Sequence, residues 1–185
     1  IFALLCLTGI RVGALISLKI RHVDLVEKSV TQNPREVATK FGKSIDTFFA
    51  KEFEDAEPAL RDWITYLDET ALYSPDDPLF PATAIKADAN LGFSRNGFDR
   101  RHWKTTEPIR KIVRLAFEAA EIKNFGPHAF RHMLSRHRVK NCKTVAELVA
   151  TSQNLGHSDV LTTLRSYGQI SREEQRKLVT GETDD

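Results

Sequence analysis

Residues 126–131 read Gly-Pro-His-Ala-Phe-Arg, and the rest of the chain is best interpreted outward from this stretch. Gly126-Pro127 ends one helical segment and starts another, because proline fits the first turn of a helix but not its interior. His128 and Arg131 are three residues apart, so they share one face of the helix that follows. The unpaired N–H groups at its start favour an anion, and a guanidinium donates to two oxygens at once. This stretch therefore favours a phosphate site.

Apolar spacing on both sides of residues 126–131 predicts a mainly helical domain. Residues 60, 63, 64 and 67 form the stripe of an amphipathic helix, and the same spacing returns from Ile109 to Ala120. Further helices are expected over residues 1–8, where Gly9 ends the helix, and over 10–18, 128–139, a short segment from 145, 162–167 and 171–179.

Residues 29–49 break this helical spacing and predict three short strands, over 29–32, 35–39 and 44–49. Asn33-Pro34 and Phe41-Gly42-Lys43 supply the turns between them. Residues 74–104 are rich in proline and glycine and predict a long loop with short ordered pieces. The expected fold class is α+β, mainly α, with a small three-stranded antiparallel sheet.

The distribution of charge points to a polyanionic partner. The net charge of the 185 residues is only +2, but residues 86–143 hold 14 lysines and arginines against five acidic residues. A solvated basic face is the alternative explanation. Within this segment, four residues are candidate phosphate contacts: Arg95, Arg100, Arg101 and Lys104. His102 and Trp103 lie beside them, and for Trp103 a packing role is at least as well supported. Lys43, outside the segment, is a fifth candidate DNA contact.

The two cysteines and the first residues narrow the class of protein. Cys6 and Cys142 do not have the spacing of a metal site or of a disulfide scaffold, which favours a reducing cytoplasm. The first seven residues are apolar but too few for a signal peptide or a membrane span. The chain starts with isoleucine, so we expect it to begin inside a longer protein, partway along a helix.

Further residues of the same chemical kind lie elsewhere in the chain. Arg11 follows the Thr8-Gly9 break near the start of a predicted helix, and His157 directly follows Gly156. Each of these residues has an ordinary explanation, because a lone arginine is usually solvated or salt-bridged. A lone tyrosine such as Tyr167 is usually part of a core. The functional interpretation therefore depends on the set and its order.

That ordered set resembles the catalytic domain of the tyrosine recombinase, or phage integrase, family. It consists of Thr8-Gly9-Ile10-Arg11, Lys40 in a hairpin turn, His128-x-x-Arg131, Leu155-Gly156-His157 and Tyr167. The flanking residues 15–25 and 158–163 resemble the family as well. The resemblance implies the fold of the DNA breaking-rejoining enzymes. It implies double-stranded DNA as partner, a homo-oligomer (a tetramer) on that DNA, and neither a metal nor another cofactor.

The resemblance also implies a role for each residue. Tyr167 would attack a DNA phosphodiester and form a 3′-phosphotyrosyl bond. Arg11 and Arg131 would hold the non-bridging oxygens, and Lys40 would protonate the leaving 5′-oxygen. By the same resemblance, His128 would act as general base or proton relay. His157 would hydrogen-bond the phosphate.

The chain departs from the family's pattern at three points. Ala14 stands where the family often has an acidic residue, and Lys43 competes with Lys40 for the role of general acid. Tyr167 lies ten residues after His157, one more than expected, which puts Ser166 at the usual position. We interpret the extra residue as a bulge or shifted turn.

Two other functions remain open at this point: a degenerate, non-catalytic DNA-binding module and a type IB topoisomerase. The family's N-terminal DNA-clamping domain is absent from residues 1–185, which are expected to form the catalytic domain alone.

Overall fold

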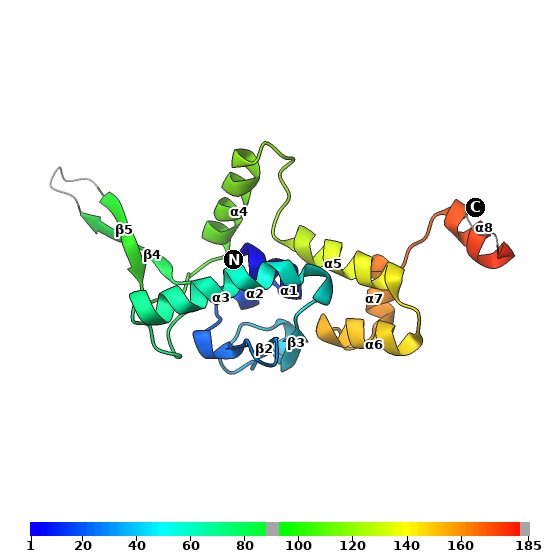
Figure 1. Cartoon of the computed structure of the whole chain (residues 1–185), viewed down its shortest axis with the longest axis horizontal. Coiled ribbons are helices and arrows are strands. Elements are labelled where there is room, and N and C mark those ends of the chain that lie inside the picture. The colour runs from blue at the N-terminus through cyan, green and yellow to red at the C-terminus, as the bar shows by residue number, and fades with distance from the viewer. Residues whose placement is uncertain (88–92, 182–185) are drawn as a thin grey trace.

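The computed structural model describes residues 1–87 and 93–181, a mainly helical body with two small antiparallel sheets (Figure 1). Its helices are α1 (Phe2–Thr8), α2 (Val12–Leu15), α3 (Glu57–Thr65), α4 (Glu107–Ala119), α5 (His128–Asn141), α6 (Val145–Asn154), α7 (Val160–Tyr167) and α8 (Arg172–Thr180). Its strands are β1 (Val23–Asp24), β2 (Ser29–Gln32), β3 (Ile45–Phe48), β4 (Ala82–Ala87) and β5 (Phe93–Asp99). Short 3₁₀ turns are η1 (Ile20–His22), η2 (Lys40–Gly42) and η3 (Lys51–Ala56), and η4 (Tyr66–Thr70) is a π-helical turn.

Helix α1 lies at the centre of the core. Its leucines Leu4, Leu5 and Leu7 are fully buried, and α1 contacts α3, α5 and β3. Gly9 ends the helix in the left-handed conformation at φ 58°, as the sequence predicts. The helix predicted over 10–18 is wrong in length, because α2 covers only Val12–Leu15. The backbone turns away after it, so that the Leu18 carbonyl accepts a hydrogen bond from Leu79 N–H at 2.9 Å.

The three-stranded sheet exists, but one of its strands differs from the prediction. The order is β1-β2-β3, with Val23 opposite Val30 and Val30 opposite Thr47. Residues 35–39, predicted as a strand, form a turn instead, because the N–H groups of residues 36 and 37 both donate to the Asn33 carbonyl. Val37 enters the core from this turn. The two-residue strand β1 takes the third place in the sheet.

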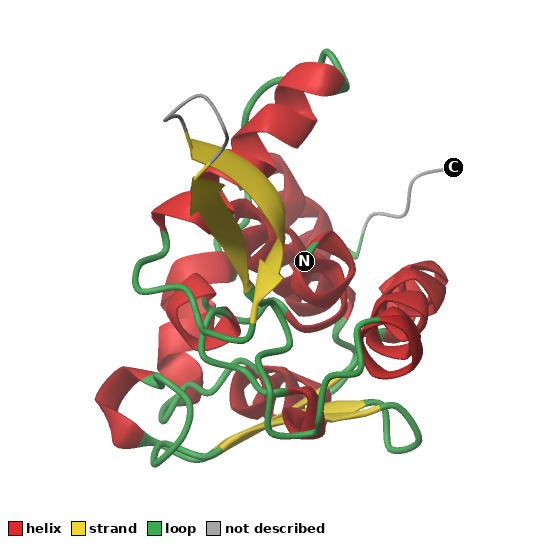
Figure 2. Cartoon of the chain, turned by 90° about the vertical axis from the view of Figure 1, so that its left-hand side faces the viewer, coloured by secondary structure: helices red, strands yellow, loops and turns green. Residues whose placement is uncertain are grey.

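A β-hairpin replaces much of the loop predicted over 74–104. Strands β4 and β5 are antiparallel, with an irregular register between Thr83 and Ile85. The ring of Phe98 meets the edge of Trp63 at 5.5 Å, which joins the hairpin to α3. In Figures 1 and 2 the hairpin and the three-stranded sheet lie on different sides of the helical body. Because residues 74–104 are rich in proline and glycine, their sequence predicts a loop rather than this hairpin.

The remaining helices form where the apolar spacing predicts them. Helix α5 packs against α1, α6 and α7, so it joins the N-terminal half of the core to the last helices. Helix α8 lies apart from this body, beyond an extended segment that follows α7 (Figure 1). No described helix is both long and apolar enough to cross a membrane.

Candidate active site

The six residues predicted to be catalytic all line one pocket of about 260 Å³. They come from the turn after α1, the turn η2, the start of α5, the turn between α6 and α7, and the end of α7. The complete lining is Arg11, Lys40, Phe41, Lys43, His128, Arg131, Gly156, His157, Ser158, Thr162 and Tyr167. None of these described lining residues is acidic, so the pocket suits an anion. Folding thus brings the set together, while the role of each member stays a prediction.

Arg131 is the structural centre of the pocket and only 4% exposed. Its Nη1 donates to the Gly9 carbonyl at 3.0 Å, and its Nη2 donates to the Leu155 carbonyl. The guanidinium therefore joins the turn that carries Arg11 to the turn that carries His157. Glycine is suited to position 9 for two reasons. Its positive φ is disfavoured for other residues, and an added Cβ would lie only 3.3 Å from the Arg131 Cα.

Arg11 is placed by the turn between α1 and α2. The Thr8 hydroxyl accepts a hydrogen bond from Ile10 N–H at 3.1 Å, which fixes the backbone at the α1 end. Arg11 is the half-buried residue before α2, with extended φ and ψ of −69° and 139°. This conformation points the chain out of α1 and past the buried guanidinium of Arg131, so both cations reach one pocket.

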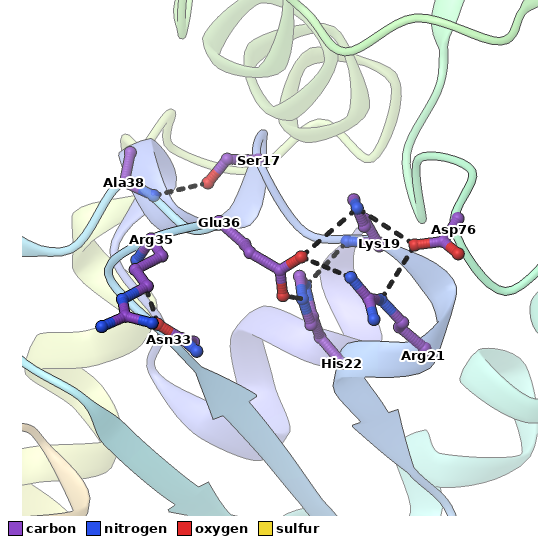
Figure 3. Close-up of polar contacts among 9 residues, drawn as sticks. All are labelled: Ser17, Lys19, Arg21, His22, Asn33, Arg35, Glu36, Ala38 and Asp76. Atoms are coloured by element: carbon purple, nitrogen blue, oxygen red, sulfur yellow. Dashed lines mark hydrogen bonds and ion pairs between the residues drawn. The ribbon is translucent and has the colours of Figure 1, made fainter.

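The segment that leads to Lys40 is held to the body by an ion-pair cluster (Figure 3). The Glu36 carboxylate lies 3.5 Å from Lys19 Nζ and 3.2 Å from His22 Nε2, and it also pairs with Arg21. Asp76 approaches Lys19 Nζ and Arg21 Nε from the other side, 3.1 Å from each. The pKa of Glu36 is lowered, chiefly by its hydrogen bond to His22, so the carboxylate stays charged.

The cluster has one defined histidine tautomer. His22 Nδ1 accepts the Lys19 N–H at 3.0 Å, so the proton of the neutral ring is on Nε2 and points to Glu36. Two residues after Glu36, the Ala38 N–H donates to Ser17 Oγ at 2.8 Å (Figure 3). The backbone is therefore fixed as far as residue 38, and Lys40 stands on a short turn beyond this anchor.

The turn η2 adopts an uncommon backbone. Phe41 has φ 65° and Gly42 has φ 61°, and a positive φ is unusual for an aromatic residue. The Phe41 ring is 79% exposed and lies 4.9 Å from Lys40 Nζ, in cation–π contact. The turn thus holds an exposed lysine and an exposed aromatic ring together at the pocket.

His157 is set by the end of α6. Gly156 turns the chain at φ 66°, and the His157 N–H donates to the Ser152 carbonyl at 3.0 Å. An added Cβ on Gly156 would meet Ile45 Cδ1 at 2.5 Å, so this turn packs directly on β3. Asn154 reinforces the contact, because its side-chain amide pairs with both backbone groups of Phe48 at 2.7 and 3.0 Å.

The hydrogen bonds of His157 define its protonation. Nε2 lies 3.1 Å from Arg131 Nη2, and a guanidinium can only donate, so Nε2 accepts. Nδ1 therefore carries the proton and donates to Thr163 Oγ1 at 2.8 Å. Burial, followed by the charges of Arg131, Arg11 and Lys40, lowers the pKa of His157 to about 4. The ring is neutral at pH 7.

Tyr167 is the last residue of α7 and is 9% exposed, whereas Ser166 points to solvent. Helix α7 is continuous from Val160 to Tyr167, so the extra residue forms no bulge within it, which leaves the shifted turn as the interpretation. The end of the helix is closed by a Gly168 N–H to Leu164 carbonyl bond of 2.8 Å. The Tyr167 ring stacks on His157 at 6.4 Å.

The other charged groups of the pocket are also shifted. Burial, followed by the like charge of Arg11, lowers the pKa of Arg131 to about 10, and the Tyr167 side chain counteracts both effects. Burial also lowers the pKa of Arg11, and the coulombic effect of Tyr167 partly offsets this shift. Both arginines remain cations at neutral pH. Partial burial and the neighbouring His132, Arg131 and Arg11 lower the pKa of His128, which favours its neutral, proton-accepting form.

Four of the five basic residues predicted to contact DNA are spread over and beside the hairpin. Arg100 donates to the Leu72 carbonyl at 2.6 Å and stacks on the Tyr73 ring, and Arg101 pairs with Asp99. Lys104 is exposed. Arg95 belongs to β5, and its side chain lies outside the described part of the structure. None of these four lines the pocket, whereas the fifth, Lys43, does. Contact with DNA stays a prediction for all five.

Nearby aromatic residues have packing contacts. Trp103 packs against the core, in line with the packing role considered for it, and His102 Nδ1 lies 3.0 Å from the Ile16 carbonyl. Within residues 1–87 and 93–181, no three His, Cys, Asp or Glu side chains are grouped so as to hold a metal ion.

Several lining residues were not found from the sequence. Phe41, Ser158 and Thr162 line the pocket itself. Arg110 of α4 lines an adjoining hollow of about 540 Å³ that shares Arg11, Lys40 and His128 with the pocket. The basic segment 86–143 contains Arg110, but its spacing alone does not distinguish it from its neighbours.

A mainly helical domain with a tyrosine among arginines, a lysine and histidines is the arrangement expected of the tyrosine recombinase class. Residues 1–174 match the model of the phage integrase family, so the chain belongs to that family. The expectation drawn from the ordered residues is confirmed at the level of family and of fold.

Individual relatives agree with this assignment. The chain is 29% identical to tyrosine recombinase XerC of Bifidobacterium longum over 94% of its length and 43% of the relative's. It is 28% identical to XerD of Staphylococcus epidermidis over 96% of its length and 51% of the relative's. The chain thus spans about half the length of the curated relatives it matches.

Solved structures show the same fold. The XerA recombinase matches 99% of this chain and 55% of its own, with a TM-score of 0.66 and 24% identity. The XerH recombinase bound to its difH substrate matches 96% of this chain and 44% of its own, with a TM-score of 0.56 and 20% identity.

Proposed function

We propose that this chain cleaves and rejoins double-stranded DNA, as a site-specific recombinase or integrase, through a covalent bond between Tyr167 and a 3′-phosphate. The observation that carries the proposal is the single pocket that holds Tyr167 with Arg11, Lys40, His128, Arg131 and His157. Relatives named as recombinases, including XerH bound to a DNA substrate, support DNA as the partner.

The two arginines are proposed to bind the scissile phosphate. The hydrogen bonds from Arg131 to Gly9, Leu155 and His157 use three of the five guanidinium N–H groups, and a side-chain hydrogen bond to Tyr167 uses a fourth, which leaves one for a phosphate oxygen. Arg11 supplies a second fork. Fixed donors of this kind are each worth roughly 3–4 kcal/mol in a transition state.

The proposal assigns one proton transfer to His128 and one to Lys40, which line the same pocket as Tyr167. Tyr167 Oη forms a bond to phosphorus, and its proton passes to neutral His128. The bond from phosphorus to the 5′-oxygen breaks, and Lys40 protonates that oxygen, so a free 5′-hydroxyl leaves. An incoming 5′-hydroxyl reverses the same steps. One phosphodiester is exchanged for one phosphotyrosyl ester, and no external energy source is required.

His157 is proposed to act first on Arg131. In its Nδ1–H form the ring accepts from Arg131 and cannot donate from Nε2 to a phosphate oxygen. A hydrogen bond from His157 to the phosphate, as the family resemblance implies, requires that a proton first reach Nε2. Until then, the imidazole orients the guanidinium toward the substrate.

A covalent-trapping experiment tests the proposal. The full-length protein is incubated with nicked suicide substrates that span candidate attachment sites, with a chelator and without ATP. A protein–DNA band on a denaturing gel is expected from the wild type and from Ser166→Ala, but not from Tyr167→Phe. Loss of the band only in Ser166→Ala would assign the nucleophile to Ser166. DNA binding without any band would favour a non-catalytic module.

The general acid is assigned by substrate chemistry. Lys40 and Lys43 both line the pocket, Lys40 exposed and Lys43 partly buried. A 5′-bridging phosphorothiolate has a leaving group that needs no proton. We expect Lys40→Ala to cleave ordinary DNA slowly and the phosphorothiolate normally, with Lys43→Ala little affected on either. The reverse pattern would give the role to Lys43.

We further propose a homo-tetramer on DNA, held in part by α8. Leu178 and Val179 of this separate helix are 70% and 80% exposed, and an apolar hollow lies between α5, α6 and α7, lined in part by Val145 and Leu148. Docking of α8 on a second copy would bury both surfaces. Sedimentation of the DNA complex should show loss of the tetramer in Leu178→Asp and its retention in Glu173→Asp, a substitution on the same helix.

A further inference from the structure

We infer that His132 is a positioning residue that holds Tyr167 for attack and acts on the neighbouring His128. The inference rests on the proposed function. Its basis is a pair of ring contacts: the His132 ring lies 5.3 Å from the Tyr167 ring at 74°, and 4.6 Å from the His128 ring at 88°. His132 is not part of the six-residue set, and it does not line the pocket.

The ring contacts arise from helix geometry. His128 and His132 are one turn apart on α5, so their side chains lie one above the other on a single face. Tyr167 comes from α7, which packs across this face. The phenol ring is thus enclosed by two imidazoles, His157 stacked at 10° and His132 nearly perpendicular at 74°.

Tyr167 needs such support because of its place in the chain. It is the last residue of α7, and helix ends fray unless their side chains are held. The chain leaves the helix at Gly168, which offers no side chain to hold the ring. A misplacement of the reacting group by about 1 Å can reduce a rate by roughly 100-fold. The perpendicular imidazole of His132 restrains the phenol by a second ring contact, in addition to the stacking on His157.

The contact with His128 is also electrostatic. The groups that face His128 are Arg131 and His132 on α5 and Arg11 before α2, and all three disfavour its protonated form. His132 is the member of the three that is also in ring contact with His128, and its coulombic effect lowers the pKa of His128. A change at residue 132 therefore alters the pH at which His128 can accept the phenol proton, in addition to the position of Tyr167.

Two substitutions separate the ring contact from the charge. In single-turnover cleavage by the full-length protein, His132→Ala should be slower by about tenfold or more, with unchanged DNA affinity. His132→Phe keeps a ring of similar size and should restore most of the rate at high pH. Because it removes the coulombic effect of His132 that lowers the pKa of His128, the acid limb of its pH profile should move to higher pH. His137→Phe on the same helix is the matched control.

A measurement without DNA accompanies the kinetics. The NMR titration of His128 in the free protein should shift to higher pH in His132→Phe and stay unchanged in His137→Phe. Equal rates for wild type and His132→Ala would overturn the inference, as would a His128 titration that does not move. Slow cleavage by both variants with a lowered melting temperature would show a merely structural role. If the wild type forms no covalent product at all, the proposed function itself fails.

Discussion

Arg131→Lys should reduce stability far more than Arg11→Lys, although both keep a positive charge in the pocket. Arg131 donates to the carbonyls of Gly9 and Leu155, and a lysine ammonium reaches only one of two such separated acceptors. A hydrogen bond to a charged group contributes about 1.5–3 kcal/mol, so the loss of one should cost about 2 kcal/mol. For a domain of this size, that corresponds to a fall in melting temperature of about 4–8 °C.

Arg11 offers the matched comparison. It is half-buried at the start of α2, and its place in the fold depends on the backbone of the α1–α2 turn rather than on its guanidinium. Its replacement by lysine should change the free energy of unfolding by less than about 0.5 kcal/mol.

Calorimetry and urea unfolding of the full-length protein measure both variants, and covalent trapping measures their activity, which should fall in each. Equal losses of stability in the two variants, or none in Arg131→Lys, would refute the idea that Arg131 joins the two turns.

Three further predictions concern the support of the pocket. Gly156→Ala should lower the free energy of unfolding by about 2–3 kcal/mol, because it combines a positive φ with a clash against β3. Gly97 has φ 75° but open space around it, so Gly97→Ala should cost only about 1 kcal/mol. Unfolding in urea compares the two variants. Asn154→Ala leaves two backbone groups of β3 without their partner and should cost about 2 kcal/mol, against less than about 0.5 for Asn141→Ala at the exposed end of α5; equal melting temperatures would contradict this. Because the pKa of His157 is lowered in the folded chain, the unfolded chain takes up this proton first as pH falls. The neutral ring therefore stabilises the fold fully above pH 6.5, and this stabilisation declines toward pH 4. His157→Gln should lessen the stability lost between pH 7 and 5 by about 1 kcal/mol, measured by urea unfolding at both pH values.

The helices could be predicted because burial imposes a period on the sequence. The stripe that starts at Leu60 and the spacing around Ile109 correspond to α3 and α4, whose inner faces contact the core. Strand β1 has only two residues, too few to show an alternation. Residues 35–39 alternate like a strand, yet the hydrogen bonds to the Asn33 carbonyl turn them into a loop. Local pattern cannot reveal such competition.

The site was predictable in its members but not in its connections. The order of Arg11, His128, Arg131 and Tyr167 suffices to select them, and the structure places all four in one pocket. The sequence does not show that Arg131 also fixes two turns, because its partners are carbonyl groups that any residue could supply. The left-handed backbone of Phe41 is equally hidden, since an exposed aromatic residue carries no sequence signal for φ.

The bond from Arg131 to a carbonyl 122 residues earlier also sets the order in which the pocket can assemble during synthesis. Arg11 leaves the ribosome long before Arg131 and Tyr167. The guanidinium cannot settle until the turn at Leu155 has emerged and docked, and the tyrosine follows only after that. A nascent chain, or one clipped between α5 and α7, therefore lacks the assembled pocket that holds Arg11, Arg131 and Tyr167.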